Sequence, residues 1–419
     1  MNLRESINDA EPMVMHIDLN SCFATVEQQA RVRLRGRPLA VVNRLAGDAM
    51  VITASYEAKT HGVKTGMRIS DAKRLCRGLV VTETDPPKYR YVYHKLLDIM
   101  NSYSASVSMK SIDEGVIDFK QAPGHLLSGR TLEQVGLEVK ARLKAEVGGA
   151  MRCNVGIATN RFLAKTAAGL HKPDGLDVIT ADNLRKVYAG MKLTDLTGIA
   201  ERNRERLESV GIMNPLQFLD TPAEVLHKMV FMSVNGDLWH QRLRGWEVDD
   251  VETQTKRIGR QFVLDGFTMS FDEILQRLHN LCESVGERLR AQGMSARGVY
   301  VGTRTFGMTG DKRRNYWHAQ FVSQVPFFSN DTIYTLAKRL FMSAPPDIRD
   351  INVHVYLLSD GEENQLSLFA DEYVRSKAIT GAVDEINYRY GERTIHAANT
   401  LPTNRIIKTK IPFGSTRYL

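Results

Sequence analysis

The sequence lacks features that would mark a membrane, secreted or disulfide-stabilised protein. No apolar run reaches the ~18–20 residues that a membrane-spanning helix needs, so we expect no membrane partner. The four cysteines, Cys22, Cys76, Cys153 and Cys282, are far apart and form no Cys-x-x-Cys pair. This spacing argues against a cysteine zinc site or a disulfide framework. The first residues show no basic segment followed by an apolar one, so we expect no secretory signal and a cytoplasmic location.

What the chain does have is an excess of basic side chains in an otherwise ordinary globular composition. It has 419 residues, which allows two to four domains at ~150 residues each. Lys and Arg number 56 against 48 Asp and Glu, a net charge of +8. A hydrophobic share of 43% excludes wholesale disorder. The basic surplus suits a polyanionic partner.

The first 175 residues predict a mixed α/β body. The apolar run 14–17 reads as a buried strand that ends at Asp18 and turns directly into a helix. The elements expected after it are a strand at 49–54, a helix at 89–101, a strand pair around 111–119, a helix at 131–147 and a strand at 153–157.

From about residue 176 the pattern becomes helical, short-looped and basic. Gly198 and Gly211 predict turns between short helices, with three arginines nearby. An ordinary α-hairpin would show similar residues. Residues 249–258 contain few apolar side chains and predict a linker.

A second folded module follows this linker. Its expected elements are a strand at about 259–265, a helix at 271–291, strands at 298–306 and 316–323, a helix at 331–342 and a strand at 351–358. This β-α-β-β-α-β order predicts a split βαβ fold. Basic residues gather at Lys256, Arg257 and Arg260, and again at 312–314. Either cluster alone is also explained as a charged strand edge that keeps the module soluble.

The end of the chain has an acidic segment around one apolar island. Residues 359–373 carry five acidic side chains and no Lys or Arg. A helix is expected over 373–390, followed by a basic end. The island consists of Gln365, Leu366, Ser367, Leu368 and Phe369.

Three carboxylates are the best candidates for chemistry. Asp18 ends a predicted central strand, and Asp113 and Glu114 lie in a predicted strand pair. If they converge, their charges repel one another unless divalent cations neutralise them. Oxygen ligands select Mg²⁺ or Mn²⁺, and two such ions promote phosphoryl transfer. The alternative is that Asp18 caps the following helix and the acidic pair forms a turn.

Four stretches in order resemble the Y-family, or lesion-bypass, DNA polymerases of bacterial type, near polymerase IV and the polymerase V catalytic subunit. A fifth, IGRQFVL (258–264), resembles the entry to the little-finger domain of that family. The four stretches are HIDLNSCFATVEQ (16–28), ITASYEAKTHGVKTGM (52–67), SIDEGVIDF (111–119) and CNVGIATNRFLAKTAAGLHKPDGL (153–176).

The resemblance implies a right-hand-like α/β multidomain polymerase. Its implied parts are a palm (1–24 and 86–175), fingers (25–85), a helix-hairpin-helix thumb (176–248), a linker (249–258), a split-βαβ little finger (259–358) and a tail (359–419). It implies template-directed, low-fidelity translesion synthesis from dNTP on primer-template DNA. The implied enzyme is a monomer that works with the bacterial sliding clamp and accessory SOS subunits.

The resemblance also assigns residues. Asp18, Asp113, Glu114 and the Leu19 carbonyl would hold two Mg²⁺ ions, with Mn²⁺ as a substitute. Phe23 matches the steric gate that excludes ribose, although a core Phe would show the same spacing. Implied nucleotide contacts are Thr53, Tyr56, Lys59 and Lys172. Implied DNA contacts are Gly198, Gly211, Lys256, Arg257 and Arg260. The implied clamp-binding peptide is Gln365, Leu366, Ser367, Leu368 and Phe369.

Several residues depart from the family pattern. Asn20 stands where many members have Asp, Lys59 replaces the usual Arg, Ser108 the frequent Glu, and Ala200 the second hairpin Gly. Lysine keeps the charge but loses the bidentate fork. Two other functions fit parts of the pattern. One is a catalytically inactive, clamp-bound scaffold in mutagenesis, against which the intact acids argue. The other is a different two-metal enzyme on a related palm, against which residues 56–66 and the little-finger module argue.

Overall fold

The computed structural model describes the chain as two compact units divided between residues 251 and 252, within the predicted linker. The residues described are 5–45, 49–120, 122, 129–251, 254–264, 269–305, 316–360 and 370–403. No helix among them is long and apolar enough to cross a membrane. The fold is mixed α/β, as expected.

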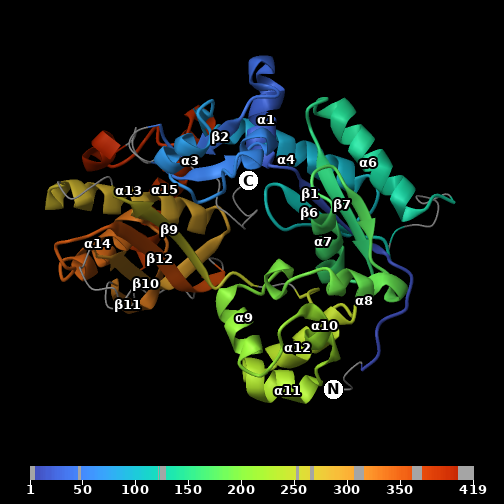
Figure 1. Cartoon of the computed structure of the whole chain (residues 1–419). Coiled ribbons are helices and arrows are strands. Elements are labelled where there is room, and N and C mark those ends of the chain that lie inside the picture. Colours follow the sequence, from blue (N-terminus) through green and yellow to red (C-terminus); the bar gives the residue numbers. More distant parts are fainter. Residues whose placement is uncertain are drawn as a thin grey trace. The chain divides into compact units, whose positions relative to one another are not determined.

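A five-stranded sheet forms the centre of the first unit, with strand order β5-β6-β1-β7-β8. Strands β6, β1 and β7 of this sheet are labelled in Figure 1. Its central strand β1 pairs antiparallel with both β6 and β7. The strands are β1 (Val14–Leu19), β5 (Val107–Met109), β6 (Glu114–Asp118), β7 (Cys153–Ala158) and β8 (Leu176–Val178).

The two faces of this sheet have different partners. Met15, Ile17 and Leu19 of β1 share a core with α4 (Pro86–Asn101) and α6 (Leu132–Glu146). Because strand side chains alternate, the intervening residues of β1 point to the opposite face. There the sheet packs on α7 (Arg161–Leu170), which contacts β1, β7 and β8. The end of β1 therefore lies between two helical layers.

The segment of the chain between β1 and β5 forms a smaller sheet of strand order β3-β2-β4. Its core contains small side chains such as Ala40, Ala58 and Ala72. The elements are α1 (Cys22–Ala30), β2 (Leu39–Val42), β3 (Val51–Ala54), α2 (Tyr56–Thr60), α3 (Ile69–Leu75) and β4 (Val80–Glu83), with a short 3₁₀ turn at Val32–Leu34.

The helical module starts later than the sequence analysis predicts. Residues 176–178, placed there at the start of the thumb, form β8, which pairs parallel with β7 at the sheet edge. A three-residue strand is too short for a periodic signal. The core of the helical module contains Phe162, Phe218 and Trp239. The elements of the module are α8 (Ala181–Ala189), α9 (Glu201–Glu208), α10 (Pro215–Asp220), α11 (Ala223–Val225) and α12 (Asn235–Leu243), with a 3₁₀ turn at Leu193–Asp195 and a π-helical turn at Leu226–Phe231.

The second unit has the predicted split βαβ order. In its sheet, β11-β10-β12-β9, strand β12 lies between β9 and β10, the two strands that α13 connects. Two helices pack on one face (Figure 1). The elements are β9 (Arg257–Val263), α13 (Phe271–Arg290), β10 (Met294–Arg304), β11 (Tyr316–Phe327), α14 (Asn330–Phe341) and β12 (Asp350–Asp360). Strand β9 thus begins inside the predicted linker.

The tail folds onto this second unit. Helix α15 (Ala370–Tyr390) is followed by a 3₁₀ segment at Ala398–Thr403 that contacts α13. Arg290 of α13 holds Asp384 through two hydrogen bonds of 2.6 and 2.8 Å. Glu283 of α13 pairs with Arg393 at 2.9 Å. These ion pairs attach the tail to the helical layer.

Candidate active site

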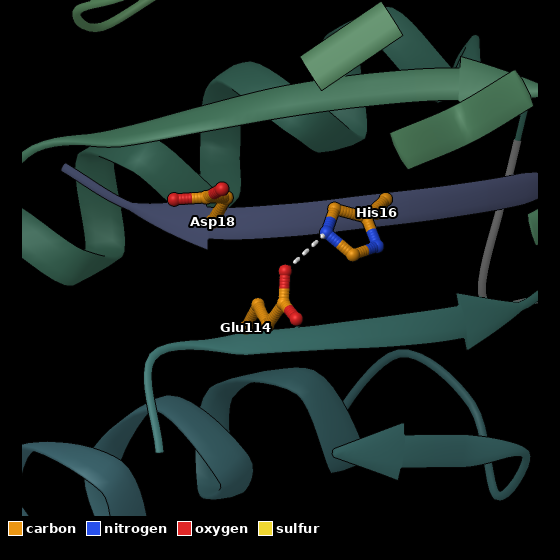
Figure 2. A group of neighbouring side chains, drawn as sticks. All are labelled: His16, Asp18 and Glu114. Carbon is orange, nitrogen blue, oxygen red and sulfur yellow. Dashed lines mark ion pairs between the residues drawn. The ribbon is translucent and has the colours of Figure 1, made fainter. Parts of the chain in front are cut away.

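Two of the predicted carboxylates meet on the α7 face of the first sheet. Asp18 pairs in register with Glu114 across β1 and β6. Both residues point to the face that also carries His16. Ligand atoms of these three residues all lie within 4.8 Å of one another (Figure 2). His16 is buried, and its Nε2 lies 3.3 Å from Glu114 Oε2.

The third carboxylate lies at the same end of the strands. Asp113 precedes β6, and its carbonyl accepts a 2.8 Å hydrogen bond from the backbone N–H of Leu19. Ser111 Oγ donates to Asp113 Oδ1 at 2.5 Å. Burial raises the pKa of Asp113, and the charges of Asp18 and Glu114 raise it further. The backbone bond places Asp113 beside the strand end that carries Asp18 and Leu19.

Two lysines neutralise the paired acids. Lys165 Nζ of α7 donates to both oxygens of Glu114, at 2.8 and 2.7 Å. Lys172 Nζ donates to Asp18 Oδ2 at 2.6 Å. Sequence reasoning named Lys172 but missed Lys165 and His16. The spacing of the two lysines carries no helical signal, because α7 ends at Leu170 and Lys172 lies beyond it.

The protonation of Glu114 follows from these partners. Burial alone would raise its pKa, but contacts with His16 and Lys165 outweigh burial and lower the pKa to about 2. Glu114 is therefore ionised at neutral pH. A largely buried anion of this kind is stabilised by the cations beside it.

A second group of side chains lies around the start of α1 and α2. Lys59 Nζ donates to Ser21 Oγ at 2.7 Å and lies 4.5 Å from the centre of the Tyr56 ring. Burial lowers the pKa of Lys59, and nearby Lys172 lowers it further. Burial raises the pKa of Tyr56, and so does the charge of Asp18. Two cations and a phenol thus lie near one another beside Asp18.

Other predicted nucleotide contacts have simpler surroundings. Thr53 lies in β3, paired in register with Val41. Phe23 lies in the first turn of α1, is 8% exposed and stacks on Tyr89, with ring centres 4.2 Å apart. This environment is that of a phenylalanine in the hydrophobic core. Only the small exposed part of its side chain could contact a sugar.

Asn20, the residue that departs from the family pattern, joins three parts of the site. Its side chain is 2% exposed. Its Nδ2 donates to Asn154 Oδ1 at 2.8 Å, and its Oδ1 accepts from Asp174 N at 2.7 Å. Asn154 in turn donates to the carbonyl of His171 at 3.0 Å. Asn20 thereby fixes the loop that presents Lys172.

We predict that Asn20→Asp destabilises the protein. Aspartate can still accept from Asp174 N, but it cannot donate to Asn154 Oδ1, because a carboxylate is an acceptor only. Asn154 cannot simply turn its amide, since its own N–H₂ is bonded to His171. The free energy of unfolding should fall by about 1–3 kcal/mol. Thermal unfolding measures this, and Asn43→Asp at an exposed position is the matched control. Equal stability of the two variants would contradict the proposed role.

A cavity of about 520 Å³ lies on the α7 side of the first sheet, and Asp18, Asp113 and Glu114 are not among its lining residues. It is lined by His16 of β1 and Lys165 of α7, which both contact Glu114, and by Gly198 and Trp239 of the helical module. Gly198 and Gly211 both have positive φ, at 96° and 85°, as their predicted turns require. Gly211 is not among the cavity-lining residues.

The basic residues predicted to contact DNA in the second unit lie on different faces of its sheet. Lys256 and Arg257 line a depression on the open face of the sheet. Arg260 is three positions beyond Arg257, on the same side of β9 as the core residue Ile258. Burial lowers the pKa of Arg260 to about 10, as does the charge of Arg288. Strand alternation turns Arg260 toward the helices, so it lies on the other face from Arg257, and its contact with DNA stays a prediction. Residues 312–314 and 365–369 lie outside the described residues.

Comparison with known proteins assigns the family. Residues 17–169 match the impB/mucB/samB family, and residues 255–368 match the C-terminal domain of that family. A DNA polymerase IV of Pelotomaculum thermopropionicum is 30% identical over 95% of this chain and 97% of its own length. DNA polymerase IV 1 of Bacillus subtilis is 27% identical over 93% of each chain.

Solved structures agree in fold. A Y-family DNA polymerase chimera aligns with a TM-score of 0.68 at 20% identity, covering 82% of this chain and 98% of that one. An insertion ternary complex of Dbh DNA polymerase aligns with a TM-score of 0.56 at 22% identity over the same shares. The chain belongs to the impB/mucB/samB family and is a bacterial Y-family DNA polymerase.

Proposed function

We propose that this protein is a low-fidelity, template-directed DNA polymerase for translesion synthesis that joins dNTPs to a primer 3′-hydroxyl by a two-metal mechanism. The convergence of Asp18 and Glu114, with Asp113 tied to the same strand end, is the observation that carries this proposal. Relatives named DNA polymerase IV support it. Primer extension on undamaged and damaged templates with Mg²⁺ is the test.

The side chains at this site fit divalent cations. Carboxylate oxygens are the donors that Mg²⁺ and Mn²⁺ prefer, and two of the acids already hold ammonium groups. The half-buried Asp113 carboxyl, with its raised pKa, has no lysine or arginine partner within the part of the chain that the structure describes. We assign Asp18, Asp113, Glu114 and the Leu19 carbonyl to two ions. Bound ions would supply charge neutralisation at the reacting phosphate.

Other residues would orient the nucleotide. Lys59 and Lys172 carry the charge needed to hold a triphosphate, and Tyr56 adds a hydroxyl donor. The contact of Lys172 with Asp18 would then be exchanged for a phosphate contact. Lys165, which grips both oxygens of Glu114, would act as a positioning residue for that carboxylate. Holding reactants in line accounts for a large part of catalysis in phosphoryl transfer.

The remaining parts would handle DNA. We assign the first unit to palm, fingers and thumb and the sheet of the second unit to the little finger. Turn amides at Gly198 and Gly211 would contact backbone phosphates without reading sequence. The cavity that Gly198 shares with Lys165, a partner of Glu114, supports a path for a DNA strand at this place. Lys256 and Arg257 would add salt-sensitive contacts.

We predict that clamp-stimulated synthesis depends on Leu368 and Phe369. The two apolar side chains are the anchors by which a short peptide enters a pocket, with Gln365 as a polar handle. Replacing both with Ala should remove stimulation by a bacterial sliding clamp and spare basal synthesis. Primer extension with and without clamp measures this. Ser367→Ala in the same peptide is the control, and stimulation that persists in the double variant would assign the peptide to the fold instead.

A further inference from the structure

The open face of the second sheet is built from aromatic rings. Side chains of Val299 and Val353 enter the helix-covered core. Because side chains alternate along a strand, their neighbours Tyr300 and His354 point to the opposite face. His354 is partnered with Tyr300 across β10 and β12. This face therefore carries rings where an antiparallel sheet in water usually carries charged side chains.

These rings are held in place by one another. The Tyr300 ring centre lies 4.2 Å from that of His354 and 5.5 Å from that of His318, with interplanar angles of 17° and 16°. The hydroxyls of Tyr300 and Tyr316 are hydrogen-bonded at 2.6 Å. The row crosses three neighbouring strands. Such a pre-organised surface loses little conformational entropy on binding a ligand.

Glycines let the rings of Tyr356 and Tyr316 lie across the backbone. A Cβ added at Gly298 would meet the Cζ of Tyr356 at 2.5 Å, and one added at Gly302 would meet the Oη of Tyr316 at 2.5 Å. Both rings thus cover β10, where any other residue would displace them. On β9, Gly259 faces His354 and leaves the space beside that imidazole without a side chain. The glycines create flat aromatic surface.

Charge on this face favours an anion. A depression of about 340 Å³ is lined by four rings, the amides Gln320 and Asn352, and the cations Lys256 and Arg257, with no carboxylate among the lining residues. Asp350, the first residue of β12, is buried, accepts a hydrogen bond from Gln261 and pairs with Arg304. Burial and the charge of Arg257 lower the pKa of His354 to about 4, so its ring is neutral near pH 7.

We propose that this face binds single-stranded DNA, with unpaired bases stacking on Tyr356 and His354 and phosphates held by Lys256 and Arg257. The proposal deepens the proposed polymerase function and rests on it for the choice of DNA. Aromatic sheet faces bind unpaired nucleotides in this way in other proteins. Bases inside a duplex cannot offer a free face to such rings. The same face would grip a duplex by phosphate contacts alone.

The test compares two single strands of equal charge. Fluorescence anisotropy of the full chain, without dNTP, measures affinity for an oligothymidine and for an abasic oligomer of the same length. The protein should bind the oligothymidine more tightly. Tyr356→Leu covers Gly298 but offers no aromatic face, and it should weaken oligothymidine binding about tenfold while leaving abasic binding unchanged. Tyr356→Phe is the control that retains the preference. Thermal unfolding verifies that both variants are folded.

Other outcomes overturn the proposal. Equal affinity of the unmodified chain for the two strands, or a preference that survives Tyr356→Leu, would mean that phosphates alone are recognised. Replacing both Lys256 and Arg257 with Ala should weaken the binding of the two single strands equally. The slope of log affinity against log salt concentration should become shallower by about one to two. The Asp113→Ala variant should keep the preference for bases, so a failure of catalysis and a failure of this surface are measured separately.

Discussion

Asp113→Ala should reduce primer extension by about 10³-fold or more. Loss of a metal-binding carboxylate removes several kcal/mol of transition-state stabilisation, and each 1.36 kcal/mol corresponds to a factor of ten in rate. The assay is single-turnover extension of an annealed primer with Mg²⁺ at saturating dNTP. Removing this carboxyl should not unfold the protein. Burial and the charges of Asp18 and Glu114 already disfavour its ionised form.

Asp118→Ala provides the matched control. Asp118 is the same type of residue and lies at the far end of β6, the strand that follows Asp113. It should retain extension within a few-fold of the unmodified chain. The pair of variants thus separates loss of the proposed ligand from loss of negative charge on β6. Full extension by the Asp113→Ala variant would place the metal site elsewhere and end the proposal.

Phe23→Ala should relax the choice of sugar by about 10- to 100-fold, measured as the ratio of kcat/KM for dNTP and rNTP. An aromatic ring at the gate would clash with the ribose 2′-hydroxyl, and one such steric contact contributes selectivity of this order. The same change also removes a buried ring that stacks on Tyr89. It should therefore lower the free energy of unfolding by about 3–5 kcal/mol.

Phe23→Leu separates these two effects. Leucine retains most of the apolar volume in the core but has no ring to press on the sugar. It should relax sugar choice at a smaller cost in stability. The selectivity ratio is independent of the fraction of folded enzyme, because both substrates meet the same molecules. An unchanged ratio in both variants would assign Phe23 to the core alone.

Local patterns explain how much of the architecture could be predicted. Alternation and helical periodicity placed the strand before Asp18 and the six elements of the second unit, since those segments are long enough to carry a period. The strand at residues 176–178 is not predicted, because three residues are too few to show an alternating pattern. Arg260 was grouped with Arg257 because proximity in sequence does not show that alternation sends two strand residues to opposite faces.

The sequence by itself determined the family, the order of the six elements of the second unit and the choice of three candidate acids, because those depend on residue type and spacing along the chain. Only the tertiary structure decided which groups face them. His16 and Lys165 reach Glu114 from β1 and α7, and Asn20 ties the loop of Lys172 to the end of β1. The electrostatics of a buried carboxylate depend on distances of a few ångströms between segments far apart in the chain. Those distances exist only once the sheet and its helices have packed.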